Sequence, residues 1–243
     1  MSFKLSLPVL AISIYFSIFL SLDSNNNLFA LEAQQHTISD QELHGYIEQM
    51  IGHLDASVEN VQNNNNLLAV AHALHPIEEI VDQIKERLKQ TNATLTKEFS
   101  DKLNQYVLTV RSNNLTKTIT DKTQLEKFLN DALEQSISFD TSSKCGYILN
   151  VTAELINVAS EEYTEAMMDG KIINLLEYQD GQQFFKRAII LLEKSQALFS
   201  ENDKRYLTKV IEMKKDLDLK RDPSEIDMNV KEMLSEIKNS VNC

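Results

Sequence analysis

The sequence NNNNLLAVAHALHPIEEIVDQIKERLKQ, residues 63–90, contains a turn and a helix whose pattern recurs along the chain. The four asparagines predict the turn, because asparagine tolerates left-handed backbone and hydrogen-bonds to its own chain. A helix is predicted over residues 67–90, and its apolar stripe consists of Leu67, Val70, Leu74, Val81, Ile84 and Leu88. Pro76 lacks a backbone N–H, so we expect a kink around residues 72–76.

The same stretch carries candidate metal ligands. On a helix of about 3.6 residues per turn, His72, His75 and Glu79 fall within about 60° of one another. Neutral imidazole suits Fe, Cu, Zn or Ni, and a carboxylate adds charge neutralisation. All five histidines lie in residues 36–75, and His53 in the preceding helix is the preferred additional ligand. The alternative interpretation is a solvated helix face that carries histidine and no metal.

The position of these residues on the helix predicts where such a site lies. His72 and Glu79 are far from the apolar stripe of residues 67–90. We therefore expect a site at a helix–helix flank or on the surface, and not one sealed in the core.

Helical periodicity runs through nearly the whole chain. Eight helices are predicted, over residues 39–62, 67–90, 94–111, 120–137, 144–168, 171–199, 202–219 and 224–241. The chain has only five Gly, three Pro and no Trp, a composition that favours helix throughout. These features predict an all-α helical bundle with strand content near zero. The loop around residues 139–143 is a candidate boundary between a first half, 34–140, and a second half, 141–243, so that the helices form one bundle or two four-helix halves.

The N-terminus has the pattern of an export signal. Lys4 precedes an apolar run from Leu5 to Leu22, and small residues follow at Ala30 and Ala33. We expect a signal peptide over residues 1–33; an uncleaved membrane anchor is the alternative, since the run is just long enough to span a bilayer. No later stretch approaches the ~20 apolar residues of a membrane helix. The mature chain is therefore expected to be secreted or extracytoplasmic, or to be tethered by its N-terminus.

The composition also bears on partners and on covalent modification. A net charge of −12 disfavours nucleic acid, because phosphate binding needs a basic surface. In an exported protein, Cys145 and Cys243 predict a disulfide, with two free thiols as the alternative. Sequons at Asn92, Asn114 and Asn150 allow N-glycosylation where the host has the machinery.

A run in the second half resembles a known family. Residues 155–172, LINVASEEYTEAMMDGKI, are followed by Glu177-Tyr178-Gln179-Asp180. Over about residues 147–190 the chain resembles the extracytoplasmic helical domain that precedes the membrane part in many prokaryotic iron permeases of the oxidase-linked type. Those domains carry a Tyr, an Ala and a Gly turn in this order, and then Glu-Tyr-x-Glu; here the last acid is Asp180.

The resemblance implies a metal-associated extracytoplasmic module that partners a separate membrane permease. Glu177 and Asp180 match the family's acidic positions. The permeases move iron through membrane helices bearing Arg-Glu-x-x-Glu, a motif that this sequence lacks, so transport is not carried over.

Laying Asn65 on Gly170 also places His72 on Glu177 and His75 on Asp180, which hints at an internal duplication.

Together these features predict an exported, non-enzymatic bundle that binds iron or copper, or else zinc, and is accessory to metal uptake. A metal-free interaction or sensory bundle is the alternative. A ferroxidase is disfavoured, because di-iron bundles use Glu-x-x-His on two helices, whereas His75-x-x-Glu78 has the reverse order and occurs once. Glu177 and Asp180 contribute to the site or form a second, weak one. The predicted metal ligands are His53, His72, His75, Glu79, Glu177 and Asp180.

Overall fold

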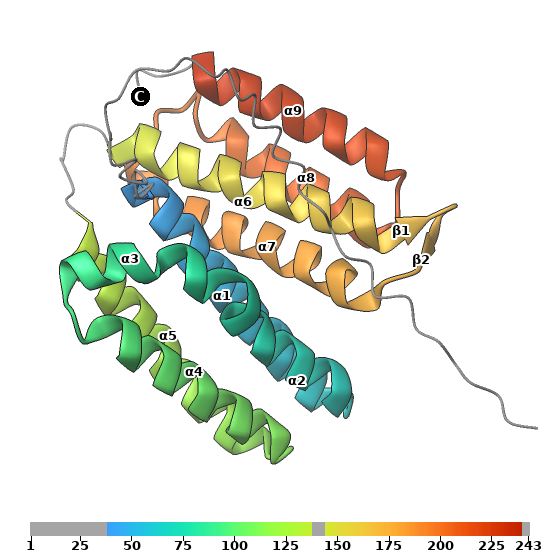
Figure 1. Ribbon diagram of the computed structural model, residues 1–243. Helices are drawn as coiled ribbons and strands as arrows, with labels where there is room; N and C mark the ends of the chain where they lie inside the picture. Colours follow the sequence, from blue (N-terminus) through green and yellow to red (C-terminus); the bar gives the residue numbers. More distant parts are fainter. Residues whose placement is uncertain (1–37, 138–143, 240–243) are drawn as a thin grey trace, which may run out of the picture. The chain divides into compact units, whose positions relative to one another are not determined.

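Helices account for nearly all of the residues that the computed structural model describes, 38–137 and 144–239 (Figure 1). The α-helices are α1 (Asp40–Gln62), α2 (Asn66–His75), α3 (Val81–Thr91), α4 (Leu95–Arg111), α5 (Leu115–Ser136), α6 (Lys144–Ala166), α7 (Leu175–Lys194), α8 (Arg205–Asp218) and α9 (Pro223–Asn239). A π-helical turn, η1 (Pro76–Ile80), joins α2 to α3 without a break, and a 3-10 turn, η3 (Gln196–Leu198), follows α7. These ranges therefore hold eight main helical segments, and the predicted all-α fold is confirmed.

Local signals explain several helix ends. Ser39 and Glu42 form the capping box at the start of α1, with Glu42 N–H donating to Ser39 Oγ at 3.2 Å and Ser39 N–H to Glu42 Oε2 at 2.7 Å. Helix α5 begins at Leu115, earlier than the predicted residue 120, because the side chain of Asn114 caps it by accepting from Lys117 N–H at 3.0 Å.

The turn at residues 169–170 differs from the prediction. The helix predicted from residue 171 begins only at Leu175, because a two-stranded antiparallel hairpin, β1 (Met167–Met168) and β2 (Lys171–Ile172), precedes it. Asp169 and Gly170 both have positive φ, of 51° and 70°, as a tight hairpin turn requires. This hairpin is the only strand pair among the described residues.

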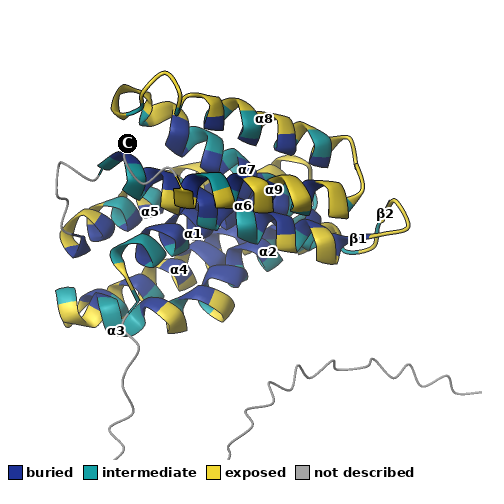
Figure 2. Ribbon diagram, turned by 90° about the horizontal axis from the view of Figure 1, so that it is seen from above, coloured by how far each residue is buried: buried dark blue, intermediate teal, exposed yellow. Residues whose placement is uncertain are grey.

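Helix α1 belongs to the first half and packs against helices of both halves. It contacts α2 and α5 on one side and α6 and α7 on the other (Figure 1). One apolar cluster is drawn from residues 43–137 and a second from residues 145–237. Figure 2 shows the buried residues gathered around α1, whereas the outer face of α8 is exposed. Because α1 is covered on several faces, it buries polar side chains as well as apolar ones: His44, Glu48, Gln49, His53, Ser57 and Asn60.

Two glycines allow α7 to approach its neighbours closely. A Cβ at Gly181 would lie 2.9 Å from the backbone oxygen of Ala159 in α6, and a Cβ at Gly52 would lie 2.8 Å from Cδ1 of Phe184. Gly181 is therefore a contact point within the continuous helix α7. Gly52 directly precedes His53, and Gly181 directly follows Asp180, so both close contacts lie beside candidate ligands.

Within the described ranges, no helix combines the length and the apolar character needed to cross a membrane.

Candidate metal site

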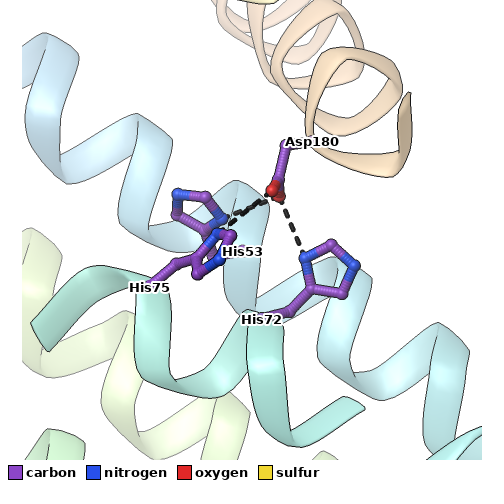
Figure 3. A group of neighbouring side chains, drawn as sticks. All are labelled: His53, His72, His75 and Asp180. Atoms are coloured by element: carbon purple, nitrogen blue, oxygen red, sulfur yellow. Dashed lines mark hydrogen bonds and ion pairs between the residues drawn. The ribbon is translucent and has the colours of Figure 1, made fainter. Parts of the chain in front are cut away.

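Four candidate ligands from three helices meet between the two halves (Figure 3). Asp180 on α7 places Oδ1 2.7 Å from Nδ1 of His53 on α1, and 3.0 Å from Nδ1 of His72 on α2. Its other oxygen, Oδ2, lies 3.2 Å from Nδ1 of His75. With one ligand atom taken from each residue, all four atoms lie within 4.8 Å of one another. Three imidazoles and one carboxylate form a donor set that can hold a divalent transition metal.

The local backbone brings the two histidines of α2 to this place. Pro76 cannot donate a hydrogen bond, and the chain responds with the π-helical turn Pro76–Ile80, in which Val81 N–H donates to Pro76 O. The expected local distortion thus takes the form of a π turn just after His75. At the start of α7, Asn174 caps the helix by accepting from Leu176 N–H at 3.2 Å, and Asp180 follows two turns later.

The cluster is buried, which corrects the expectation of a flank or surface site. The exposed fraction is 0% for His72 and Asp180, 2% for His53 and 8% for His75. The apolar stripe of α2 does not predict which of its residues are buried, because α2 contacts α1 and α7 as well as α4. The polar flank of α2 is therefore covered by a second layer of helices, and that layer brings its own polar side chain, Asp180.

The partners of His72 constrain its protonation. Its Nε2 lies 2.8 Å from Gln179 Oε1, which also accepts a hydrogen bond from Asn60 Nδ2 at 2.8 Å. If Nε2 carries the proton of a neutral ring, Nδ1 presents a lone pair to the carboxylate of Asp180 at 3.0 Å. Two lone pairs at this distance repel, so either a second proton or a metal ion has to lie between them. An outer hydrogen bond of this kind is also typical of metal-ligating histidine.

Two buried atoms of the cluster have no hydrogen-bond partner. His75 Nδ1 and Asp180 Oδ2 lie 3.2 Å apart, but they are not aligned for a hydrogen bond, and neither has another partner. Unsatisfied buried polar atoms are costly. A cation bound between them would satisfy both, so the residues present fit a metal ion.

The charges of the cluster depend on one another. Burial opposes ionisation of Asp180, but the three imidazoles around it, His53 foremost, hold the pKa of its carboxyl well below its ordinary range. Burial alone would lower the pKa of His75, but the nearby carboxylate of Asp180 reverses this effect, and the pKa of His75 is raised. Without a metal ion, protons stabilise the cluster, and a metal ion would compete with them.

Two predicted ligands lie beside the cluster and not in it. The side chain of Glu79 is 52% exposed; its Oε1 lies 3.8 Å from His75 Nδ1 and its Oε2 lies 3.9 Å from His53 Nε2. Glu177 is partly buried on α7 and accepts from Asn174 Nδ2 at 3.3 Å. Neither Glu79 nor Glu177 is among the residues whose ligand atoms all lie within 4.8 Å of one another.

Sequence reasoning missed one further carboxylate, Glu162 on α6. Burial and a hydrogen bond to Glu177 raise the pKa of Glu162 well above its ordinary value, with Asp180 and Glu79 adding to the effect. Burial is also the first cause of the raised pKa of Glu79, against which the imidazoles of His75 and His53 act. No motif distinguishes Glu162 from the other acids of α6, so only the fold identifies it.

Other predicted positions lie elsewhere. His44 lies near the start of α1, with Nδ1 3.2 Å from Tyr147 Oη. Cys145 is buried in the first turn of α6, whereas Cys243 and the predicted leader, residues 1–33, lie outside the described residues. The disulfide and the signal peptide therefore stay predictions. The three sequon asparagines, Asn92, Asn114 and Asn150, are all exposed, and their glycosylation stays a prediction as well.

No significant match was found among curated proteins or among solved structures. A family model described as the iron permease-associated 4-helix bundle domain matches residues 138–242. This match includes the segment around residues 147–190 and confirms the resemblance to the iron permease family there. It covers α6 to α9 and contributes Asp180 to the cluster, whereas all three histidines lie outside it. Residues 138–242 thus match an iron permease-associated 4-helix bundle domain, and the helices before this segment supply the three imidazoles.

Proposed function

We propose that this protein is an exported, non-enzymatic binding protein for a divalent transition metal, accessory to a membrane metal permease. Iron is the first choice of metal, copper the second, and zinc is accommodated by the same ligands. The single observation that carries the proposal is the meeting of His53, His72, His75 and Asp180 with ligand atoms within 4.8 Å. The iron permease-associated domain at residues 138–242 supports iron and supports a permease as partner.

The chemistry of the ligands supports a divalent ion. Imidazole and carboxylate suit Fe, Cu and Zn in their divalent states, whereas Cu(I) prefers the thiolate or thioether ligands that this cluster lacks. Three neutral imidazoles and one carboxylate leave a net positive charge on a bound ion, and the nearby carboxylates of Glu79 and Glu177 offset it. The ligands come from helices, which hold them close to their binding positions in advance.

The protein's place outside the cytoplasmic membrane belongs to the same proposal. It is supported by the apolar leader-like run in residues 5–22 and by the resemblance of the second half to extracytoplasmic domains. A binding protein in this compartment would collect metal ions and present them to the permease that carries them across the membrane.

Titration calorimetry tests the proposal with anaerobic Fe²⁺, with Cu²⁺ and with Zn²⁺. We expect one ion per chain, bound more tightly than about 10 μM, with Cu²⁺ the tightest in vitro according to the general order of divalent metals. The variant His72→Ala/His75→Ala should lose this binding while keeping its helical circular dichroism. His44→Ala is the matched control, because it removes a buried imidazole from the same bundle outside the cluster.

Two results would overturn the proposal. The first is wild-type protein that binds none of the three ions more tightly than about 10 μM. The second is a folded double variant that binds as tightly as the wild type. Either result would favour the metal-free interaction bundle.

A further inference from the structure

Glu79 occupies a particular place between solvent and the buried cluster. The exposed fraction of the side chain falls stepwise from 52% at Glu79 to 10% at His75, 3% at His53 and 0% at Asp180. His75 and Glu79 lie on the two sides of Pro76, at the end of α2 and in the π turn. The π turn thus carries an exposed carboxylate on the solvent side of the cluster.

The atoms along this path are spaced so that an ion can pass from one to the next. Glu79 Oε1 lies 3.8 Å from His75 Nδ1, which in turn lies 3.2 Å from Asp180 Oδ2. His75 is more than nine-tenths buried, and neither its Nδ1 nor Asp180 Oδ2 has a hydrogen-bond partner. Two unsatisfied buried atoms therefore continue the line that begins at the exposed carboxylate.

Further negative charge surrounds this side of the cluster. Glu177 on α7 interacts electrostatically with both His75 and Glu79, and Glu162 on α6 interacts with Glu177 and Glu79. Burial raises the pKa of Glu162 to about 9, so this group is protonated at neutral pH, and the negative charge on this side comes from Glu79 and Glu177. A negative potential of this kind raises the local concentration of cations and the rate at which they bind.

We infer that Glu79 is the exchange ligand of the metal site: a divalent cation first binds its exposed carboxylate and then passes to His75 and Asp180, and it leaves by the reverse route. Glu177 supplies further negative charge beside Glu79. This inference rests on the proposed function and deepens it, because a site with such a route releases its ion to a partner instead of storing it. Glu79 is a transient ligand, because its side chain is half exposed and it is not among the residues whose ligand atoms all lie within 4.8 Å of one another.

Stopped-flow absorbance with Co²⁺ as the probe tests the inference on the purified protein. Glu79→Gln should slow association about tenfold, the lower end of the effect of electrostatic steering, and should not speed dissociation. Glu78→Gln is the matched control: it removes the same charge from the neighbouring exposed position of the same π turn, and its rates should equal those of the wild type.

The outcomes separate this inference from the proposed function. Wild-type protein that binds no Co²⁺, Fe²⁺, Cu²⁺ or Zn²⁺ contradicts the proposed function. Wild-type protein that binds Co²⁺ while Glu79→Gln associates at the wild-type rate contradicts the exchange ligand alone. Equal slowing in Glu78→Gln and Glu79→Gln also contradicts it, because a general charge effect would then replace a specific route.

Discussion

Among the described residues, two buried carboxylates, Glu48 and Asp180, face histidine, and their other partners differ. Glu48 on α1 lies 3.6 Å from His44 Nε2 and accepts from Arg187 Nε at 2.7 Å. Asp180 faces three imidazoles, and no lysine or arginine of the described residues forms an ion pair with it. Arginine is always charged, whereas imidazole loses its proton near neutral pH. Glu48 is therefore neutralised permanently, and Asp180 only while protons or a metal ion are present.

This difference separates a structural ion pair from a binding site. Burial opposes ionisation of Glu48, but His44 and Arg187 together keep its pKa below the ordinary value. Arg187 also lies 3.8 Å from Asp55 and 3.7 Å from Glu126, so this network joins α1, α5 and α7. A buried histidine beside an acid is thus not sufficient for a metal site. The histidine cluster differs because its carboxylate depends on an exchangeable cation.

The largest expected effect comes from breaking the permanent pair. Arg187→Met leaves Glu48 buried without its guanidinium, and removing one partner of a buried pair costs about 3–5 kcal/mol of stability. Urea unfolding should show this loss, while the metal affinity of the folded fraction stays that of the wild type. A variant of unchanged stability would mean that Glu48 does not depend on Arg187.

Removing the charge of Asp180 should instead weaken metal binding and leave the metal-free protein stable. Asp180→Asn keeps the shape of the side chain but removes the charge that holds the cation. Wild-type protein should gain about 2.7 kcal/mol of stability from a metal at one hundred times its Kd, and Asp180→Asn should gain almost none. Thermal unfolding with and without Zn²⁺ measures both gains. An equal gain in the variant would remove Asp180 from the site.

The close packing of α6 against α7 can be tested by substituting two glycines. Gly181→Ala introduces a Cβ 2.9 Å from the backbone oxygen of Ala159, so α6 and α7 must move apart beside Asp180. We expect a loss of about 1–3 kcal/mol, as for other overpacked sites, together with weaker metal binding. Gly146→Ala is the control, because its Cβ would meet nothing within 4 Å, and it should leave stability unchanged or raise it slightly.

The sequence predicts the helices well and the site only in part. Periodicity identifies each helix because one apolar stripe must face a core. Of the stripe predicted over residues 67–90, Ile84 and Leu88 are buried, whereas Leu67 is 87% exposed. The same reasoning fails for His72, whose polar flank is covered by α7. The contacts of Asp180 with His53 and His72 join residues 127 and 108 positions apart. No local pattern predicts such a contact.

The family resemblance and the pattern of histidines each predicted some of the candidate ligands. Only the fold shows that these residues lie together. Glu79 and Asp180 were both predicted, but nothing in their spacing indicates that one is exposed and the other sealed. The difference comes from the π turn and from the cover that α7 provides. Glu162 lay within the family-like run and carried no signal of its own, because its surroundings are set by Glu177 on another helix.

Glu154 is a third carboxylate to compare with Glu48 and Asp180, and replacing it should change stability least. Glu154 on α6 lies against α1, where a Cβ on Gly45 would be 2.7 Å from its carboxyl carbon. Burial, and then the charge of Glu42, raises the pKa of Glu154 from 4.5 to about 7. Because the folded-state pKa is above the unfolded one, its contribution to stability is complete below about pH 4.5 and is lost as the pH rises through 7.

Glu154→Gln should therefore match the wild type at pH 4.5 and be more stable at pH 8. We expect a gain on the order of 1 kcal/mol, after allowance for the partial exposure of the carboxyl group. Urea unfolding at the two pH values measures it, with Glu165→Gln on the exposed face of α6 as the control that should show no such dependence. A Glu154→Gln curve parallel to the wild type at both pH values would mean that Glu154 finds a cation or solvent that its contacts with α1 do not provide. The charge of Glu154 would then be compensated in the folded protein, as that of Glu48 is. Glu48 and Asp180 would then differ only in the arginine beside Glu48.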